Sequence, residues 1–201
     1  MNAEEGAGEK PKKIRAFIAL KTPAIWDAAL RKLQEELKGK LRSKAFKWTK
    51  PEQIHITMRF FGYILPEEVE AVRKRMEEVV RGHAAFSLRC EGLGCFPTLR
   101  RPRVLWVGIA GDTVALETLQ ASVTVATRDF GEPPEDRTFR AHLTLARIQQ
   151  AERSAIEGLE KALERGLTIE AEWRVKELIL MQSHLSPHGA RYERVASWPL
   201  I

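Results

Sequence analysis

Short apolar runs alternate along the chain with longer segments in which apolar residues recur every three or four positions. The short runs are typical of strands, and the longer period is typical of helices that bury one side. We therefore expect strands at 14–20, 46–48, 54–61, 85–91, 104–109, 139–148, 167–173, 175–182 and 191–196. Helices are expected at 22–39, 66–82, 113–129 and 151–165. Because strands and helices are interleaved, the protein belongs to the α+β or α/β class.

Two segments between these elements are expected to be loops. Residues 96–103 carry two prolines and the arginines Arg100, Arg101 and Arg103 beside Phe96. A basic loop with an aromatic ring could follow an RNA backbone and stack a base, although an ordinary solvated loop explains the same residues. Residues 183–189 contain a proline and a glycine and are expected to form a second loop.

The composition narrows the class of protein. The chain has 201 residues, 44% of them hydrophobic, which is enough for one domain or two closely packed lobes. Its two cysteines exclude a disulfide scaffold, and no apolar run reaches the roughly 18 residues of a membrane span. Residues 1–13 lack the apolar segment of a signal peptide. We expect a flexible leader at 1–13, a single domain at 14–201, and a soluble, cytoplasmic protein.

One four-residue pattern occurs twice, as His55-Ile56-Thr57-Met58 and as His142-Leu143-Thr144-Leu145, each time within a strand-like segment. Side chains alternate between the faces of a strand, so each histidine shares a face with the threonine two residues later. A single copy would carry little weight, because a histidine in a strand is more often structural than catalytic. Two copies in matching contexts indicate two related lobes that contribute to one site.

Two imidazoles and two hydroxyl groups on facing strands suit the hydrolysis of a phosphodiester. One imidazole takes a proton from water, the other protonates the leaving oxygen, and the hydroxyl groups of Thr57 and Thr144 hold the non-bridging oxygens. Histidine fits both roles because its ordinary pKa of about 6.5 lies near neutral pH. The repeated pattern therefore predicts an acid–base site for phosphate chemistry.

Other side chains near the repeated pattern are candidates for contacts with a substrate. Arg59 lies four residues after His55, so strand alternation places it on the histidine face, where it binds phosphate or forms a surface ion pair. Arg147 lies five residues after His142 and reaches that face only through a bulge or the end of the strand. Trp48 offers a surface for base stacking, but tryptophan in a strand is more often part of a core.

The repeated pattern and its flanking residues resemble the 2H phosphoesterase superfamily. Within it, the chain is similar to the bacterial and archaeal RNA 2′,3′-cyclic phosphodiesterases, also called 2′-5′ RNA ligases. The matching segments are 15–19, 48–62, 96–97, 101–106, 139–147 and 185–192, which together extend over nearly the whole chain after the leader. Ala141 and Met58 stand where relatives commonly have proline and leucine, and neither lies on the polar face.

The resemblance implies an α+β fold of two pseudo-symmetric lobes, each an antiparallel sheet flanked by helices, around a central cleft. It implies hydrolysis of a terminal 2′,3′-cyclic phosphate of RNA to a 2′-phosphomonoester without a metal or other cofactor. His55 would protonate the departing 3′-oxygen and His142 would activate water, a distinction that the residues themselves do not make. Thr57, Thr144 and Arg147 would contact the phosphate. Run backward, the same chemistry would join a 5′-hydroxyl to the cyclic phosphate in a 2′-5′ linkage.

Two other functions fit the same residues. One is a module that binds RNA ends without turnover, and the other is a phosphodiesterase of small cyclic nucleotides or 2′-5′ oligonucleotides. The 33 lysines and arginines against 27 acidic residues give a formal net charge of +6, which suits a polyanionic partner but does not establish one, because many basic proteins bind nothing acidic. Two titratable histidines favour turnover, because binding alone does not need them. We expect a monomer without an obligatory protein partner.

Overall fold

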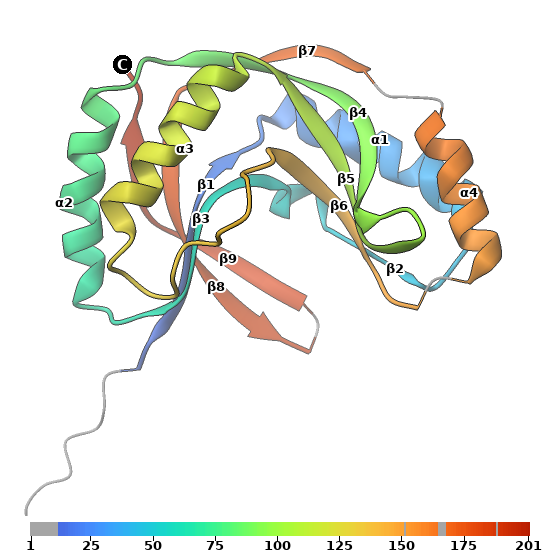
Figure 1. Cartoon of the computed structure of the whole chain (residues 1–201), viewed down its shortest axis with the longest axis horizontal. Coiled ribbons are helices and arrows are strands. Elements are labelled where there is room, and N and C mark those ends of the chain that lie inside the picture. Colours follow the sequence, from blue (N-terminus) through green and yellow to red (C-terminus); the bar gives the residue numbers. More distant parts are fainter. Residues whose placement is uncertain (1–11, 151, 165–167, 188) are drawn as a thin grey trace, which may run out of the picture.

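The computed structural model describes residues 12–150, 152–164, 168–187 and 189–201. Within these ranges the chain forms two curled antiparallel sheets, each with helices packed against one face (Figure 1). The expected α+β class with two pseudo-symmetric lobes is therefore confirmed. The leader expected at 1–13 lies outside the described residues apart from Lys12 and Lys13.

Each sheet takes strands from both halves of the chain. The first sheet has the strand order β3-β1-β8-β9, with β1 at Ile14–Lys21, β3 at His55–Ile64, β8 at Glu177–Ser186 and β9 at Gly189–Pro199. The second has the order β2-β6-β5-β4-β7, with β2 at Phe46–Trp48, β4 at Phe86–Thr98, β5 at Arg101–Gly111, β6 at His142–Ile148 and β7 at Thr168–Val175. The two lobes are consequently interlocked.

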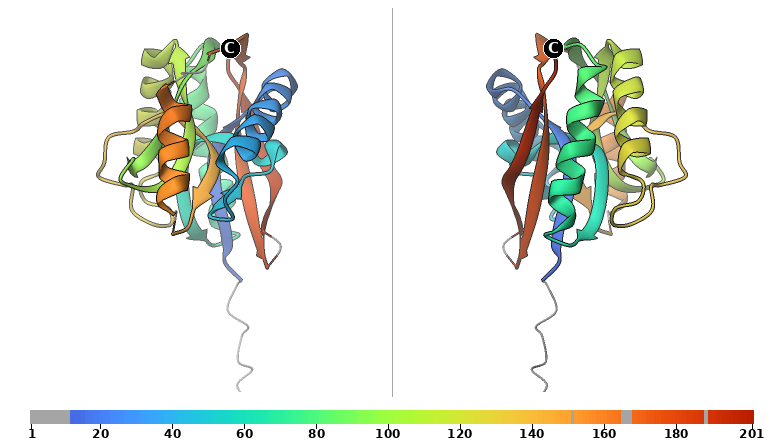
Figure 2. Two further views of the ribbon diagram at one scale, coloured as in Figure 1. Left: turned by 90° about the vertical axis from the view of Figure 1, so that its right-hand side faces the viewer. Right: turned by 90° about the vertical axis from the view of Figure 1, so that its left-hand side faces the viewer.

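Helices cover one face of each sheet. They are α1 at Ala24–Leu41, α2 at Glu68–Arg81, α3 at Thr113–Thr127 and α4 at Arg153–Glu164, with a 3₁₀ turn, η1, at Pro51–Gln53. Helices α2 and α3 pack beside the first sheet, and α1 and α4 pack beside the second (Figures 1 and 2). We call the opposite face of each sheet its inner face. None of the helices in the described ranges combines the length and the apolar character that crossing a lipid bilayer requires.

Both segments that were expected to be loops belong to hairpins. Strands β4 and β5 pair as far as Thr98 and Arg101, with register shifts that accommodate glycine and proline residues which usually interrupt a strand. Gly94 is required in this hairpin, because the indole of Trp106 occupies the place of a Cβ atom. Strands β8 and β9 likewise pair up to Ser186 and Gly189. In both places the paired strands of the hairpin extend into residues whose local sequence favours a turn.

Several element boundaries also lie a few residues from their expected positions, among them the end of α1 and the start of β6. Helix α1 continues past Gly39 to Leu41, and Arg42 closes it in the left-handed conformation with φ of 40°. The Nε atom of Arg42 donates to the carbonyl of Gly39, which satisfies part of the helix end. Strand β6 begins at His142 rather than at Phe139, so that the second histidine is the first residue of its strand, as His55 is in β3.

Candidate active site

The two histidines have the same orientation at the starts of β3 and β6. The Nδ1 atom of His55 lies 2.7 Å from the carbonyl oxygen of Gln53, and that of His142 lies 2.7 Å from the carbonyl oxygen of Arg140. A carbonyl only accepts hydrogen bonds, so Nδ1 carries the proton in each neutral ring. The free Nε2 atom is left to exchange a proton with another molecule.

Aromatic rings enclose both imidazoles. The ring of His55 stacks on Phe17 with centroids 4.8 Å apart, and the edge of Tyr192 approaches it at 5.5 Å. The ring of His142 meets Phe96 edge to face at 5.0 Å. These contacts fix the plane of each imidazole and remove water from its sides.

Burial lowers the pKa of both histidines, because the charged imidazolium loses hydration. The pKa of His55 falls to about 4, and the positive charges of Lys21 and His142 contribute to this change. The pKa of His142 is lowered mainly by burial and further by the charges of Arg137 and Arg147. Strands β3 and β6, which carry the two histidines, lie in contact with each other. In the free protein, the lowered pKa values favour the neutral form of both imidazoles at pH 7.

The threonines lie as strand alternation predicts. Thr57 is exposed and Thr144 is half-buried, each two residues after its histidine. The intervening Ile56 and Leu143 are 1% and 0% exposed and belong to the core. Each strand therefore carries an imidazole and a hydroxyl group on one face and anchors them through aliphatic residues on the other.

A bulge in β6 brings Arg147 to the histidine face. Thr144 pairs with Trp106, whereas Ala146 pairs with Leu105, so Leu145 is an extra residue in the ladder. The extra residue reverses the alternation, and Arg147 emerges as an exposed side chain on the same face as Thr144. The bulge that the spacing of Arg147 required is present.

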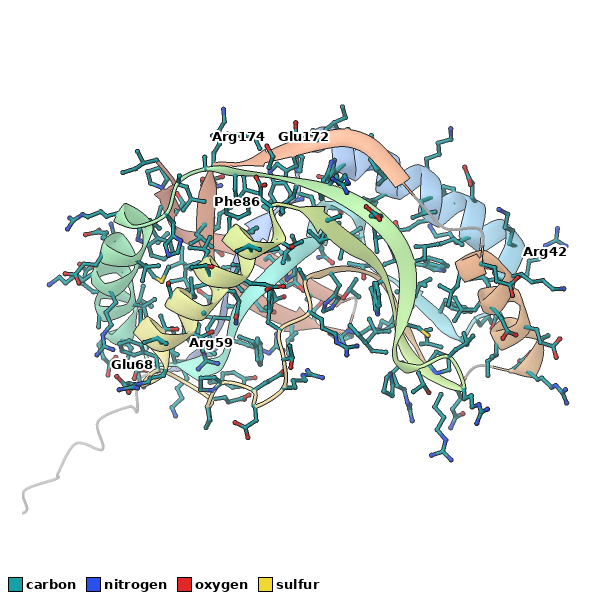
Figure 3. The ribbon with its side chains drawn as sticks, turned by 45° about the horizontal axis from the view of Figure 1, so that its top comes forward. Arg42, Arg59, Glu68, Phe86, Glu172 and Arg174 are labelled. Carbon is teal, nitrogen blue, oxygen red and sulfur yellow. The ribbon has the colours of Figure 1, made fainter. Side chains whose placement is uncertain are left out.

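The same kind of bulge turns Arg59 away, so the face predicted for this residue is wrong. Thr57 pairs with Ala19 and Arg59 with Ile18, which leaves Met58 as the extra residue. Arg59, which is labelled in Figure 3, is 5% exposed, and its guanidinium donates to the carbonyls of Phe60, Phe130 and Glu132. This guanidinium ties β3 to the connector after α3.

Phe60 takes the position in β3 that Arg147 holds in β6. It pairs with Phe17, the residue that stacks on His55. The guanidinium of Arg15, on the neighbouring strand, lies 4.6 Å above the centre of the Phe60 ring. The two halves of the site are thus alike in their histidines and threonines and differ at this position, where one half has an arginine and the other a phenylalanine.

Two glutamines that sequence reasoning missed hold the two bulges. The Nε2 atom of Gln34 in α1 donates to the carbonyl of the bulge residue Leu145 at 3.0 Å and to that of Thr49 at 2.7 Å. The Nε2 atom of Gln120 in α3 donates to the carbonyl of the other bulge residue, Met58, at 3.2 Å. Each glutamine supplies a partner for a carbonyl of the bulge. The signal for Gln34 was a polar residue on the buried stripe of a helix, where it is 1% exposed.

The basic segment at 96–103 is divided between the site and the hairpin end. Phe96 contacts His142, as described above, whereas Arg100, Arg101 and Arg103 are exposed at the far end of the β4–β5 hairpin. Across the described ranges, no three histidine, cysteine, aspartate or glutamate side chains come together in a way that could hold a metal ion.

Comparison with known proteins agrees with the repeat. The family model described as LigT like Phosphoesterase matches the chain twice, over residues 22–106 and 107–192. Each match contains one copy of the histidine–threonine pattern. The two matched segments together span most of the chain.

Individual relatives match over most of their own length. The RNA 2′,3′-cyclic phosphodiesterase of Aquifex aeolicus is 29% identical over 191 residues, which cover 94% of this chain and 98% of the relative. That of Aeropyrum pernix is 32% identical over 148 residues, 73% of this chain and 82% of the relative.

Solved structures match the fold. A crystal structure from Thermus thermophilus superimposes with a TM-score of 0.77 at 27% identity and covers 93% of this chain and 98% of its own. Escherichia coli LigT complexed with 3′-AMP has a TM-score of 0.71 at 21% identity and covers 94% of this chain and 99% of its own. The arrangement of the two sheets is thus shared with these structures.

Proposed function

Because the chain belongs to the LigT like phosphoesterase family, we propose that it opens 2′,3′-cyclic phosphate ends of RNA to 2′-phosphomonoesters without a metal ion. Relatives that carry the name RNA 2′,3′-cyclic phosphodiesterase support the substrate class. The observation that carries the reaction is the matched pair of imidazoles, each with Nδ1 bonded to a carbonyl and Nε2 free. Hydrolysis of a phosphodiester needs one acid and one base, and this pair supplies both.

In the proposed reaction, Nε2 of His142 removes a proton from water while the water oxygen attacks phosphorus. The bond between phosphorus and the 3′-oxygen breaks, and Nε2 of protonated His55 gives its proton to that oxygen. The phosphate remains on the 2′-oxygen and the ribose regains its 3′-hydroxyl group. His142 then releases its proton to solvent and becomes neutral, and the negative charge of the next bound phosphate favours the protonation of His55 that a new cycle requires. The same sequence, with an RNA 5′-hydroxyl in place of water as the attacking group, forms a 2′-5′ linkage and leaves the 3′-hydroxyl free.

The remaining side chains stabilise the negative charge on phosphorus. The hydroxyl groups of Thr57 and Thr144 donate to the non-bridging oxygens, one from each inner face. Arg147 lies beside Thr144 and donates to the same oxygens through its planar guanidinium. Arg59 has no part in this contact, since its guanidinium is engaged with main-chain carbonyls.

The product of the reaction tests the proposed function. We expect purified protein in EDTA and ¹⁸O-labelled water to convert an RNA with a 2′,3′-cyclic phosphate end to a 2′-phosphate that contains one ¹⁸O atom, as measured by mass spectrometry and ³¹P NMR. A 3′-phosphate product would overturn the proposed direction of attack. Binding of the RNA end without any product would instead identify a module that only binds RNA ends.

The bulge in β6 gives a second prediction. Gln34→Leu removes the side-chain donor from the carbonyl of Thr49 and one of the two donors to the carbonyl of Leu145, which also accepts from the N–H of Thr49. The loss should lower the free energy of unfolding by about 1–3 kcal/mol. Arg147→Ala should raise KM because it removes a contact with phosphate, and because the bulge directs Arg147, Gln34→Leu should raise KM as well. The two changes should be non-additive in a double-mutant cycle, since both weaken the same interaction with phosphate.

Gln120→Leu is the matched control for this cycle. It removes the corresponding hydrogen bond from the bulge in β3, where the residue placed on the inner face is Phe60 rather than an arginine. We expect a loss of stability similar in kind, and effects on KM that simply add to those of Arg147→Ala. Additive effects of Gln34→Leu and Arg147→Ala on KM would show that Gln34 stabilises the fold but does not position Arg147.

A further inference from the structure

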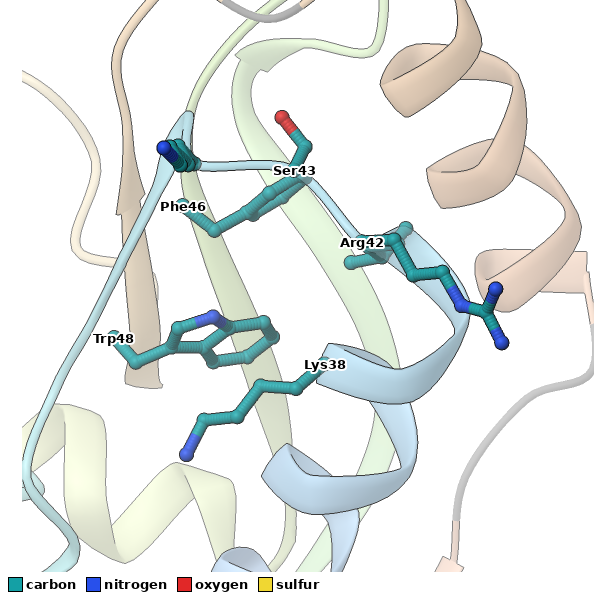
Figure 4. A pocket seen from close by; sticks show the side chains of 7 residues that line it. Lys38, Arg42, Ser43, Phe46 and Trp48 are labelled. Atoms are coloured by element: carbon teal, nitrogen blue, oxygen red, sulfur yellow. The ribbon is translucent and has the colours of Figure 1, made fainter.

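A pocket of about 350 Å³ lies on the outer side of β2, next to the end of α1 (Figure 4). We call it the β2 pocket. It falls outside the residues that the proposed reaction uses, and its size lies within the range of small-molecule sites. The residues that line it are Lys38, Leu41, Arg42, Ser43, Lys44, Phe46 and Trp48.

The lining of the β2 pocket combines positive charge with an aromatic platform. Three of its side chains are cationic and none is acidic. The half-buried indole of Trp48 lies between the ring of Phe46, with centroids 5.8 Å apart, and the Nζ atom of Lys38, 5.8 Å from its centre (Figure 4). This combination suits a nucleotide of a single strand, because the base stacks on the ring and the cations attract the backbone.

The side chain of Lys38 can move away from the face of Trp48 and expose it to a ligand at little cost in free energy. Its ammonium group is partly exposed and pairs with Glu35, itself an exposed residue, at 2.9 Å. Exposed ion pairs of this kind contribute little to stability. The lysine can therefore move from the indole to a phosphate when a base takes its place.

The β2 pocket adjoins the proposed phosphate site through one strand. Strand β2 is the edge of its sheet and pairs with β6, so that Lys47 lies opposite Arg147 and Trp48 opposite Ala146. Lys47 is exposed and shares the inner face with Arg147, whereas Trp48 points to the outer side. Neighbouring strands lie about 5 Å apart. Positively charged side chains therefore extend from Arg147, through Lys47 at the edge of the sheet, to the β2 pocket.

From this arrangement we propose that the β2 pocket binds a nucleotide on the 5′ side of the cyclic phosphate in a single-stranded RNA. The strand crosses the sheet edge beside Lys47 and stacks one base on Trp48. The inference rests on the proposed function for the position of the RNA end. It adds a second point of attachment, which a mononucleotide substrate cannot reach.

The test compares substrates of two lengths that share one reactive end. The substrates are a nucleoside 2′,3′-cyclic phosphate and a ten-nucleotide RNA that ends in the same nucleotide. We expect Trp48→Leu to lower kcat/KM for the long RNA about tenfold through KM, and to change the value for the mononucleotide less than twofold. An equal effect on the two substrates, or no effect on either, would overturn the proposal.

A surface variant covers the case in which Trp48→Leu does not fold. Lys38→Gln/Lys44→Gln should weaken the affinity for the ten-nucleotide RNA and flatten its dependence on salt by about 0.7 in the log–log slope for each phosphate that is no longer neutralised. Arg73→Gln/Lys74→Gln on α2, at the other end of the molecule in Figure 1, removes the same charge and should change neither quantity.

Measurements of RNA binding distinguish a failure of this proposal from a failure of the proposed function. If the wild-type protein hydrolyses neither substrate, the proposed function fails. The affinity for the ten-nucleotide RNA then tests whether the β2 pocket binds RNA. A roughly tenfold loss of affinity in the pocket variants would support the proposal, and an unchanged affinity would overturn it. If the variants weaken binding of a polyglutamate peptide and leave RNA binding unchanged, the pocket accepts acidic protein segments and the proposal is overturned.

Discussion

Replacing either His55 or His142 by alanine should lower kcat/KM on cyclic-phosphate RNA by at least about 100-fold, in line with the usual contribution of a general acid or base. Each variant keeps one imidazole and both threonines, so binding of the RNA should change far less than turnover. Steady-state kinetics and equilibrium binding on the same RNA measure the two effects. His83→Ala is the matched control, because His83 lies beyond the end of α2 and its imidazole bonds to Ser122 rather than to the proposed site.

A substrate with a better leaving group distinguishes the acid from the base. Sulfur in place of the 3′-bridging oxygen departs as a thiolate, which needs little protonation at neutral pH because thiols have a pKa near 8.5. This substrate should restore most of the rate in His55→Ala and little of it in His142→Ala. The opposite pattern would exchange the two roles, and full activity of either alanine variant on ordinary RNA would remove that histidine from the mechanism.

The pH dependence of turnover is the second large effect. The reaction requires one neutral and one protonated imidazole, and this form of the free protein is most abundant between the two pKa values of the pair. Burial lowers both, that of His55 to about 4 and that of His142 below its usual value. The profile of kcat/KM should therefore be bell-shaped with its maximum below pH 6.5, and fall about tenfold per pH unit on its alkaline side.

Bound substrate should shift the pH profile of turnover to higher pH. The negative charge of the bound phosphate favours the imidazolium form and raises the pKa values of both histidines. The alkaline limb of kcat should consequently lie at higher pH than that of kcat/KM. Rates measured from pH 4 to 9 at constant ionic strength give both curves. A kcat/KM that stays constant up to pH 8 would show that the free protein does not hold its histidines in neutral form.

The polar face of each histidine strand could be predicted from the sequence because it depends on local geometry. Alternation over three residues is enough to place Thr57 with His55 and Thr144 with His142. The buried neighbours of both threonines follow from the same rule. The aromatic rings around the histidines could not be derived in this way, because Phe17 and Tyr192 come from other strands of the sheet.

The two arginines show where local rules fail. Simple alternation placed Arg59 on the histidine face and Arg147 off it, and one bulge in each strand reverses both assignments. The bulges are held by Gln120 and Gln34, which lie 62 and 111 residues away from the carbonyls that they bind. The side of the strand on which an arginine emerges thus depends on the packing of a distant helix.

The most direct test of the paired-histidine reaction follows one RNA in three proteins. Wild type, His55→Ala and His142→Ala are incubated in EDTA with a 5′-labelled RNA that ends in a 2′,3′-cyclic phosphate, under single-turnover conditions. We expect a 2′-phosphate product from the wild type and at least 100-fold slower formation from both variants. The same product at the wild-type rate from either variant, or a wild type that binds the RNA and leaves it unchanged, would contradict the proposed function.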